Sequence, residues 1–386
     1  MKEIKKYIVI VCINTVLFLV FNMATAGIPV YVSTLDNNQV STGLTTTIAA
    51  VAALAIRPLA GNVLDKNNKS NALIVGMALM TVPLFVSLLF KNVYLILVMR
   101  IFQGMGWGLA STACSVLIAN SAPKNKVSEY IGYAGLVSSI ATAFAPVIAL
   151  VVFEKKGAET MLELMGICML ITIVIFLCFR KIYFANSVKK STTINRVFEK
   201  RAIGSAVIIF FVTVSYSPII TFISQYGSAL RIKNISLFFA VYACATIVIR
   251  PIAGRYVDRK GYVFPCYIAM VGALGSLLFL WSADNIVSFC VAGGIAGISM
   301  GIGTNSLQSL AIVKSELQKR GVAVSTFLFG FDLGMACGSF LSGFLSAWGG
   351  YKCMYGIMAI FPIVGIVIVM IVNKNGYLEA KIEHND

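Results

Sequence analysis

Charged residues are scarce in this 386-residue chain, and their scarcity excludes most classes of soluble protein. Only 12% of the residues are Asp, Glu, Lys or Arg, whereas 59% are hydrophobic and the mean hydropathy is +0.88. A typical soluble domain has about a quarter of its residues charged and about half of them apolar. The composition therefore excludes a soluble enzyme, a nucleic-acid-binding module and a disordered tail.

Histidine and paired cysteine are also almost lacking. The one histidine, His384, lies in the polar C-terminal tail, and the nine cysteines stand singly without any C-x-x-C pair. We interpret the cysteines as small hydrophobic residues, because most of them lie inside apolar runs. With no histidine cluster and no nucleophile–base pair, the sequence predicts no metal site, no cofactor and no enzymatic activity.

Long apolar runs are what the sequence does contain. A helix that crosses the hydrocarbon layer needs about 20 largely apolar residues. Runs of about this length cover residues 7–33, 42–64, 71–90, 93–119, 129–152, 160–180, 202–226, 236–257, 262–283, 286–312, 322–346 and 351–373. We therefore predict an all-α integral membrane protein with twelve transmembrane helices in a lipid bilayer.

An internal repeat divides these helices into two halves. Residues 57–66 read RPLAGNVLDK and residues 250–259 read RPIAGRYVDR, so that five of ten positions are identical at an offset of 193 residues. Two pseudo-symmetric six-helix halves with a substrate site near the midplane are a known transporter plan. We predict halves at residues 1–180 and 202–373, a cytoplasmic linker at 181–201 and a cytoplasmic tail at 374–386.

Positive charge predominates, with 31 Lys and Arg against 15 Asp and Glu and a net charge of +16. With the N-terminus inside, the inner segments and the span ends next to them hold 24 of these bases, the outer loops and the span ends next to them hold 6, and Arg100 is left over inside a span. Since cytoplasmic loops collect Lys and Arg, the excess reports orientation and predicts that both termini are cytoplasmic. No nucleic-acid partner is expected.

Three motifs carry a family resemblance. Residues 61–69 are similar to the loop signature G-x-x-x-D-R-x-G-R-K, and residues 254–261 are closer to its full form. Residues 100–108 (RIFQGMGWG) are similar to R-x-x-q-G-x-G, and Gly132 to Ala149 follow an antiporter pattern with alanine for most glycines. The chain resembles the major facilitator superfamily, in its twelve-helix drug:H⁺ antiporter-like branch. The resemblance implies proton-coupled transport of a small molecule.

Two charged residues inside spans are the candidates for coupling. An unpaired guanidinium in lipid costs at least ~3 kcal/mol, so Arg100 must face a polar interior. In the resembled family an arginine here serves proton coupling or binds anionic groups; the alternative is a structural arginine bonded to backbone carbonyls. Asp332 is the only acid well inside a span. It either carries the transported proton or pairs with a base such as Arg57.

The repeated motif predicts a conformational latch between the halves. Glycine permits close helix approach, and an aspartate there can face a helix N-terminus or pair with a base. The alternative is plain anchoring by positive charge. The latch candidates are Arg57, Gly61, Asp65, Lys66, Lys69, Arg250, Gly254, Asp258 and Arg259.

Uncharged polar residues within spans are candidates for the substrate cavity, because they are expensive in lipid without partners. Gln103 and Trp107 lie one and two turns beyond Arg100 and would share its face. The remaining candidates are Asn14, Asn22, Tyr216, Gln225, Asn305 and Gln308. For each of these six, an interhelical hydrogen bond is an equally good interpretation.

Three functions follow as hypotheses. The first is proton-coupled efflux of small amphipathic molecules by alternating access, in the plasma membrane of a bacterial cell. The second is transport of anionic metabolites, such as sugar acids or chelators, with Arg100 as a carboxylate clamp. The third is a membrane sensor that transports nothing. We expect a monomer whose partners are the small-molecule substrate, protons and the lipid bilayer.

Overall fold

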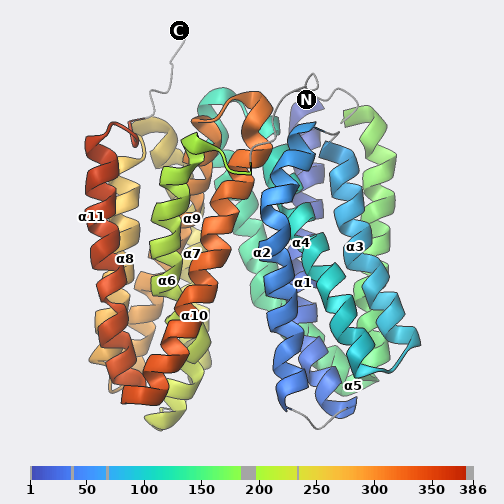
Figure 1. The fold of residues 1–386 in the computed structure, drawn as a ribbon, viewed down its shortest axis with the longest axis horizontal. Coiled ribbons are helices and arrows are strands. Elements are labelled where there is room, and N and C mark those ends of the chain that lie inside the picture. Colours follow the sequence, from blue (N-terminus) through green and yellow to red (C-terminus); the bar gives the residue numbers. More distant parts are fainter. Residues whose placement is uncertain (1, 36–38, 67–68, 184–196, 233, 380–386) are drawn as a thin grey trace. The chain divides into compact units, whose positions relative to one another are not determined.

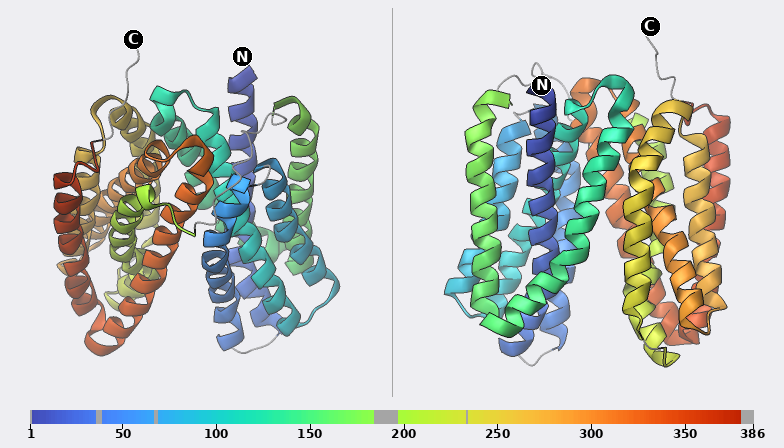
Figure 2. Two further views of the ribbon diagram at one scale, coloured as in Figure 1. Left: turned by 45° about the horizontal axis from the view of Figure 1, so that its top comes forward. Right: turned by 180° about the vertical axis from the view of Figure 1, so that it is seen from behind.

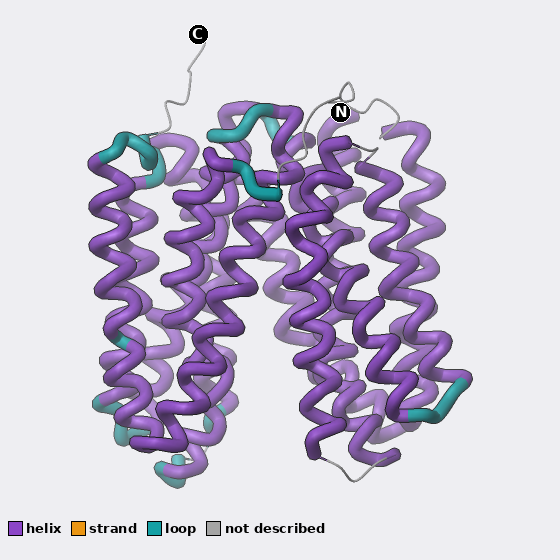
Figure 3. The backbone as a smooth tube through the Cα atoms, in the orientation of Figure 1, coloured by secondary structure: helices purple, strands orange, loops and turns teal. Residues whose placement is uncertain are grey.

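The secondary structure is helical, with short loops between the helices, in the part of the chain that the structure, a computed structural model, describes (Figures 1 and 3). These are residues 2–35, 39–66, 69–183, 197–232 and 234–379. In a bilayer, a helix satisfies every backbone N–H and C=O within its own segment, which is why apolar runs of this length adopt it. The all-α prediction is confirmed.

The helices have the following bounds: α1 Lys2–Leu35, α2 Gln39–Lys66, α3 Lys69–Leu89, α4 Val93–Ser121, α5 Val127–Tyr183, α6 Lys200–Ala229, α7 Ser236–Lys260, α8 Val263–Trp281, α9 Ile286–Val313, α10 Arg320–Met358 and α11 Ile360–Lys374. Short 3₁₀ turns, Lys124–Lys126 and Leu317–Lys319, precede α5 and α10. Among the described residues, ten helical stretches are long and apolar enough to cross a membrane.

Two of these stretches are each long enough for two crossings. The stretch through α5 is 54 residues long and bends at Gly157, where φ is 86°; the stretch through α10 and α11 is 58 residues long and bends at Gly350, where φ is 75°. Glycine adopts such positive φ values without steric cost, so the chain reverses there without a loop. Counting both bends gives the predicted twelve spans among the described residues, although the runs on either side of each bend, predicted as separate spans, are joined within one helical stretch.

The chain folds into two compact units. The first comprises Met1–Ala122, Val137–Phe198 and Leu317–Ser325, and the second comprises Pro123–Leu136, Glu199–Glu316 and Thr326–Asp386. Each unit thus takes the first turns of one helix, α5 or α10, whose remainder belongs to the other unit. The predicted boundaries at 180 and 202 stay predictions; residues 184–196 of the linker and 380–386 of the tail lie outside the described residues.

Within each unit the packing follows the repeat. Helix α4 packs against α2 and α3 in the first unit, and α9 packs against α7 and α8 in the second (Figure 2). Gly104 lies against the Ala49 carbonyl, and Gly297, 193 positions later, lies against the Tyr242 carbonyl, 193 positions after Ala49. Small residues at these contacts permit close helix approach. The 193-residue offset found in the ten-residue repeat therefore also relates the helix contacts of the two units.

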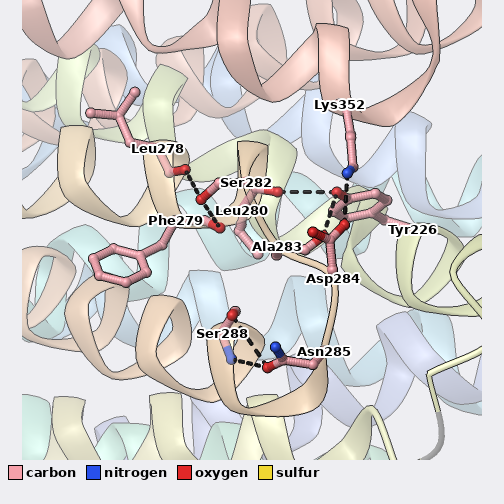
Figure 4. Close-up of polar contacts among 10 residues, drawn as sticks. All are labelled: Tyr226, Leu278, Phe279, Leu280, Ser282, Ala283, Asp284, Asn285, Ser288 and Lys352. Carbon is pink, nitrogen blue, oxygen red and sulfur yellow. Dashed lines mark hydrogen bonds and ion pairs between the residues drawn. The ribbon is translucent and has the colours of Figure 1, made fainter.

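The connection between α8 and α9 is held by Tyr226 of α6. Its hydroxyl donates hydrogen bonds to the carbonyls of Leu280 (3.1 Å) and Ala283 (3.3 Å), as Figure 4 shows. Beside it, the Lys352 ammonium lies 2.7 Å from the Asp284 carboxylate. Tyr226 is buried in the apolar core of this unit, so these bonds fix the turn to the core.

Candidate substrate and coupling sites

Arg100 lies on α4 in the interior of the first unit, with only 1% of its surface exposed. Its Nε donates to the Thr45 carbonyl of α2 at 2.8 Å, and its Nη1 donates to Oε1 of Gln103. Arg100 Nη2 and Gln103 Nε2 have no hydrogen-bond partner among the described residues. No carboxylate in that part of the chain pairs with Arg100. The site is therefore a buried cation with two unsatisfied donors.

Trp107 lies two turns beyond Arg100 and contacts α1. Its ring stacks on Phe21, with centroids 4.3 Å apart and planes 7° apart, and meets Phe18 edge-on at 4.8 Å. All three rings are half-buried. Stacked and edge-on pairs of this kind are favourable beyond the area that they bury. The arrangement gives α1 and α4 an aromatic surface in the first unit.

The two asparagines of α1 join this helix to α5. Asn14 donates to the Ser138 hydroxyl at 2.8 Å, and Asn22 donates to the Phe18 carbonyl at 2.8 Å and to the Thr142 hydroxyl at 3.5 Å. Asn14 is buried, whereas Asn22 is half-buried. The geometry therefore favours the interhelical hydrogen bond between α1 and α5 as the role of Asn14.

The second unit contains the other predicted cavity residues and Asp332. Tyr216 of α6 stacks on Tyr242 of α7, with centroids 5.5 Å apart. Asn305 of α9 is buried and donates to the Arg250 carbonyl at 3.2 Å. Gln225 is exposed, while Gln308 and Asp332 are half-buried.

Asp332 lies on α10 between glycines that pack against α6. Gly330 and Gly334 lie against the carbonyls of Ala206 and Phe210, and a Cβ at Gly338 would come 2.6 Å from the Val214 carbonyl oxygen. This strip of glycines places one face of α10 close to α6. The pairing of Asp332 with Arg57 stays a prediction.

Asp65, at the end of α2, caps the start of α10. Its carboxylate accepts hydrogen bonds from the backbone N–H of Gly321 (2.8 Å) and Val322 (2.9 Å), and it is 7% exposed. A Cβ at Gly61 would lie 2.7 Å from the Val322 Cα, so only glycine permits this approach. The free N–H groups and dipole of a helix start favour a carboxylate at this place.

Asp258 does the same for α5 in the second unit. It accepts from the backbone N–H of Ser128 (3.1 Å) and Glu129 (2.8 Å), and a Cβ at Gly254 would lie 2.6 Å from the Ser128 carbonyl oxygen. Gly321 and Val322 lie 193 residues after Ser128 and Glu129. Both repeats therefore contain the same capped helix start.

The surroundings of the two caps differ. Arg255 donates to the Glu129 carboxylate at 3.0 Å near Asp258. Near Asp65, the buried Lys69 interacts electrostatically with Asp65 and with Arg320. Arg259 is exposed and has no contact of this kind among the described residues, and the side chain of Lys66 lies outside them.

The paired arginines of the repeat have different partners. Nη1 of Arg57 donates to the Gly108 carbonyl (3.1 Å) and to the hydroxyls of Ser111 (2.8 Å) and Thr112 (2.9 Å), all on α4. Nη1 of Arg250 donates instead to the Gly135 carbonyl on α5. The two halves of the repeat thus share the arginine, but its hydrogen-bond partners lie on α4 in the first unit and on α5 in the second.

Sequence reasoning missed the partners of both caps and the second tyrosine. Nothing local distinguishes Gly321 or Ser128, because their contacts span 256 and 130 residues of chain. The signal available was the repeat itself, since positions 128 and 321 are separated by the same offset as Asp65 and Asp258. Tyr242 lies in an apolar run without any motif.

Twelve apolar crossings built from two repeats, with a buried arginine inside one of them, define a polytopic membrane transporter. The Major Facilitator Superfamily matches residues 10–317 and 203–385, and the chain belongs to this family. The predicted family and fold are thereby confirmed.

Relatives are similar over most of their length. The staphylopine export protein of Staphylococcus aureus is 22% identical over 356 residues, covering 84% of this chain and 85% of the relative. The multi-drug resistance efflux pump PmrA homolog of Lactococcus lactis is 20% identical over 377 residues, covering 94% and 93%. Among solved structures, a bacterial homologue of the iron transporter ferroportin has a TM-score of 0.77 at 12% identity, covering 96% and 99%.

Proposed function

We propose that the protein exports small amphipathic molecules in exchange for protons, by alternating access, from the cytoplasm of a bacterial cell. In this proposal it lies in the plasma membrane as a monomer with both termini in the cytoplasm. The names of the two sequence relatives, both exporters, support the direction of transport. The distribution of Lys and Arg supports the orientation.

The observation that carries alternating access is the repeated cap. Asp65 and Asp258 each accept two backbone N–H bonds at the start of a long helix, with a glycine at each contact. Both helices, α5 and α10, continue from one compact unit into the other. A charge-assisted bond that forms in one conformation and breaks in the other biases a two-state equilibrium. The two caps are the proposed latch.

Asp332 is the proposed proton carrier. Carboxylates within membrane spans are rare and commonly mark proton or substrate pathways. Removal of its carboxyl group, as in Asp332→Asn, should uncouple transport from the pH gradient while leaving the fold intact. The alternative role, pairing with a base, predicts slower alternation with coupling retained.

The experiment has two stages. A transporter-deficient host that expresses the protein is first grown against a broad compound panel to find a substrate. The purified protein is then reconstituted, and flux of that substrate is measured with and without an imposed pH gradient. Flux that ignores the gradient would reject proton coupling.

Transport of an anionic metabolite is a second candidate, favoured by the buried cation at Arg100. Its Nη2 and the Gln103 amide nitrogen are donors without partners among the described residues. These donors could bind an acceptor group, such as a carboxylate, on a substrate. Competition by anionic against cationic compounds in the same flux assay separates the two candidates.

A further inference from the structure

Arg250 presents an unused hydrogen-bonding edge in the second unit. Its Nη1 is engaged by the Gly135 carbonyl, but its Nε is buried and has no partner, and its Nη2 makes no hydrogen bond, among the described residues. Nε and Nη2 form one side of the planar guanidinium. This edge matches the two oxygens of a carboxylate.

No carboxylate among the described residues fills this edge. The electrostatic interactions of Arg250 within the described part of the chain are with Tyr216 and Tyr242, not with an acid. An arginine within a membrane span is costly unless a polar or anionic group compensates it. The positive charge of Arg250 therefore has no acidic partner among the described residues.

Two phenols stand beside the guanidinium. Tyr242 lies eight residues, or about two turns, before Arg250 on α7. The Tyr216 and Tyr242 rings stack with centroids 5.5 Å apart and planes 23° apart, and the two phenols interact electrostatically. Tyr216, Tyr242 and Arg250 are each half-buried, so each residue keeps part of its surface exposed, although the Arg250 Nε itself is buried.

The repeat indicates that this cluster is not part of the scaffold. The positions 193 residues before Tyr216 and Tyr242 hold Met23 and Ala49, which have no hydroxyl. In the first unit, Arg57 donates hydrogen bonds to the hydroxyls of two α4 residues. The corresponding α9 residues, Thr304 and Asn305, bond instead to carbonyls of their own helix and to the Arg250 carbonyl.

We infer that Arg250, Tyr216 and Tyr242 form a binding subsite for an anionic group, a carboxylate carried on a flat apolar body. The Nε–Nη2 edge of Arg250 binds the two carboxylate oxygens, and the tyrosine pair contacts the apolar body. The inference deepens the proposed function, because it assigns the substrate an acidic group, and it rests on the protein being a transporter. Arg100, by contrast, is almost fully buried and already uses its Nε.

A charge series on one ring system tests the subsite. Binding of 2-naphthoate, 2-naphthamide and 2-naphthylmethylamine to the purified full-length protein in uncharged detergent is measured by equilibrium dialysis. We expect naphthoate to bind at least about tenfold more tightly than the amide, since a guanidinium–carboxylate fork is worth that much or more. Equal binding of naphthoate and amide to the wild-type protein would overturn the subsite.

Variants locate the preference. Arg250→Gln should reduce the preference for naphthoate over amide to within about threefold and leave amide binding unchanged. Lys374→Gln, which removes an exposed positive charge at the end of α11, is the matched control and should keep the full preference. Retention of the preference in Arg250→Gln would place the anion elsewhere and refute the assignment.

Two further arms keep the outcome decisive. Should Arg250→Gln fail to fold, the double variant Tyr216→Phe/Tyr242→Phe keeps the ring volumes and should weaken naphthoate binding several-fold. Unchanged naphthoate binding in this variant rejects the subsite.

Phosphatidylglycerol added to the micelles tests a lipid headgroup as the anion, and loss of naphthoate binding in its presence rejects a substrate site. Because dialysis involves no pH gradient, failure of proton coupling leaves these results intact.

Discussion

Replacing Asp65 by Asn removes the charge from the cap on α10 while keeping the size of the side chain. The carboxylate now accepts from two backbone N–H groups, at 2.8 and 2.9 Å, in an almost fully buried position. An asparagine offers one acceptor oxygen, and its amide nitrogen would face the second N–H. The conformation that contains the cap should therefore become less populated.

The size of the effect follows from the bond type. A hydrogen bond to a charged group contributes roughly 1.5–3 kcal/mol net, so losing one changes the ratio of the two conformations by about ten- to a hundredfold. Asp258→Asn should have a smaller effect. One of its bonds is longer, at 3.1 Å, and the neighbouring Glu129 carboxylate already repels Asp258.

Spin-label distance measurements can read these populations. Tyr94 and Val287 are exposed residues at the starts of α4 and α9, one in each unit, and they occupy equivalent positions of the repeat. Labels are attached at Tyr94→Cys and Val287→Cys in a background without the nine native cysteines. Two distance populations whose ratio shifts more for Asp65→Asn than for Asp258→Asn are expected. Unchanged populations in both variants would refute the latch.

Three other outcomes are expected. Gly106→Ala should lower the free energy of unfolding by about 1–3 kcal/mol, because the new Cβ would lie 2.7 Å from the Gly76 carbonyl oxygen. Gly275→Ala is the control: its Cβ would lie 3.7 Å from the nearest atom, so this variant should match the wild type in thermal unfolding. Tyr226→Phe should cost about 0.5–1.5 kcal/mol in the same assay through its lost hydrogen bonds, and no loss would contradict the role shown in Figure 4. Arg100→Gln should reduce substrate flux in proteoliposomes at least tenfold, and wild-type flux would exclude Arg100 from transport.

The spans could be predicted from the sequence because length and hydropathy determine what crosses a bilayer. The runs 93–119 and 286–312 agree closely with α4 and α9, whose bounds are Val93–Ser121 and Ile286–Val313. The bends at Gly157 and Gly350 were not predicted, because a single glycine permits but does not require a positive φ.

The candidate sites were only partly predictable. Arg100 and its neighbour Gln103 could be found, since a charge in an apolar run stands out and a spacing of one turn predicts proximity. The capped helix starts join residues far apart in sequence, so the aspartates could be identified but not their partners. Tyr242 could not be found, because a tyrosine in an apolar span reads as an ordinary lipid-facing or packing residue.

Proton-coupled flux through Asp332 is the central claim, and one measurement tests it most directly. Wild-type and Asp332→Asn proteins are reconstituted into liposomes, and movement of an identified substrate is followed with and without a pH gradient. The wild-type protein should move the substrate against its concentration gradient only when the pH gradient is present, and the variant should move it only down that gradient. Wild-type flux indifferent to pH, or normal coupling in the variant, would contradict the account.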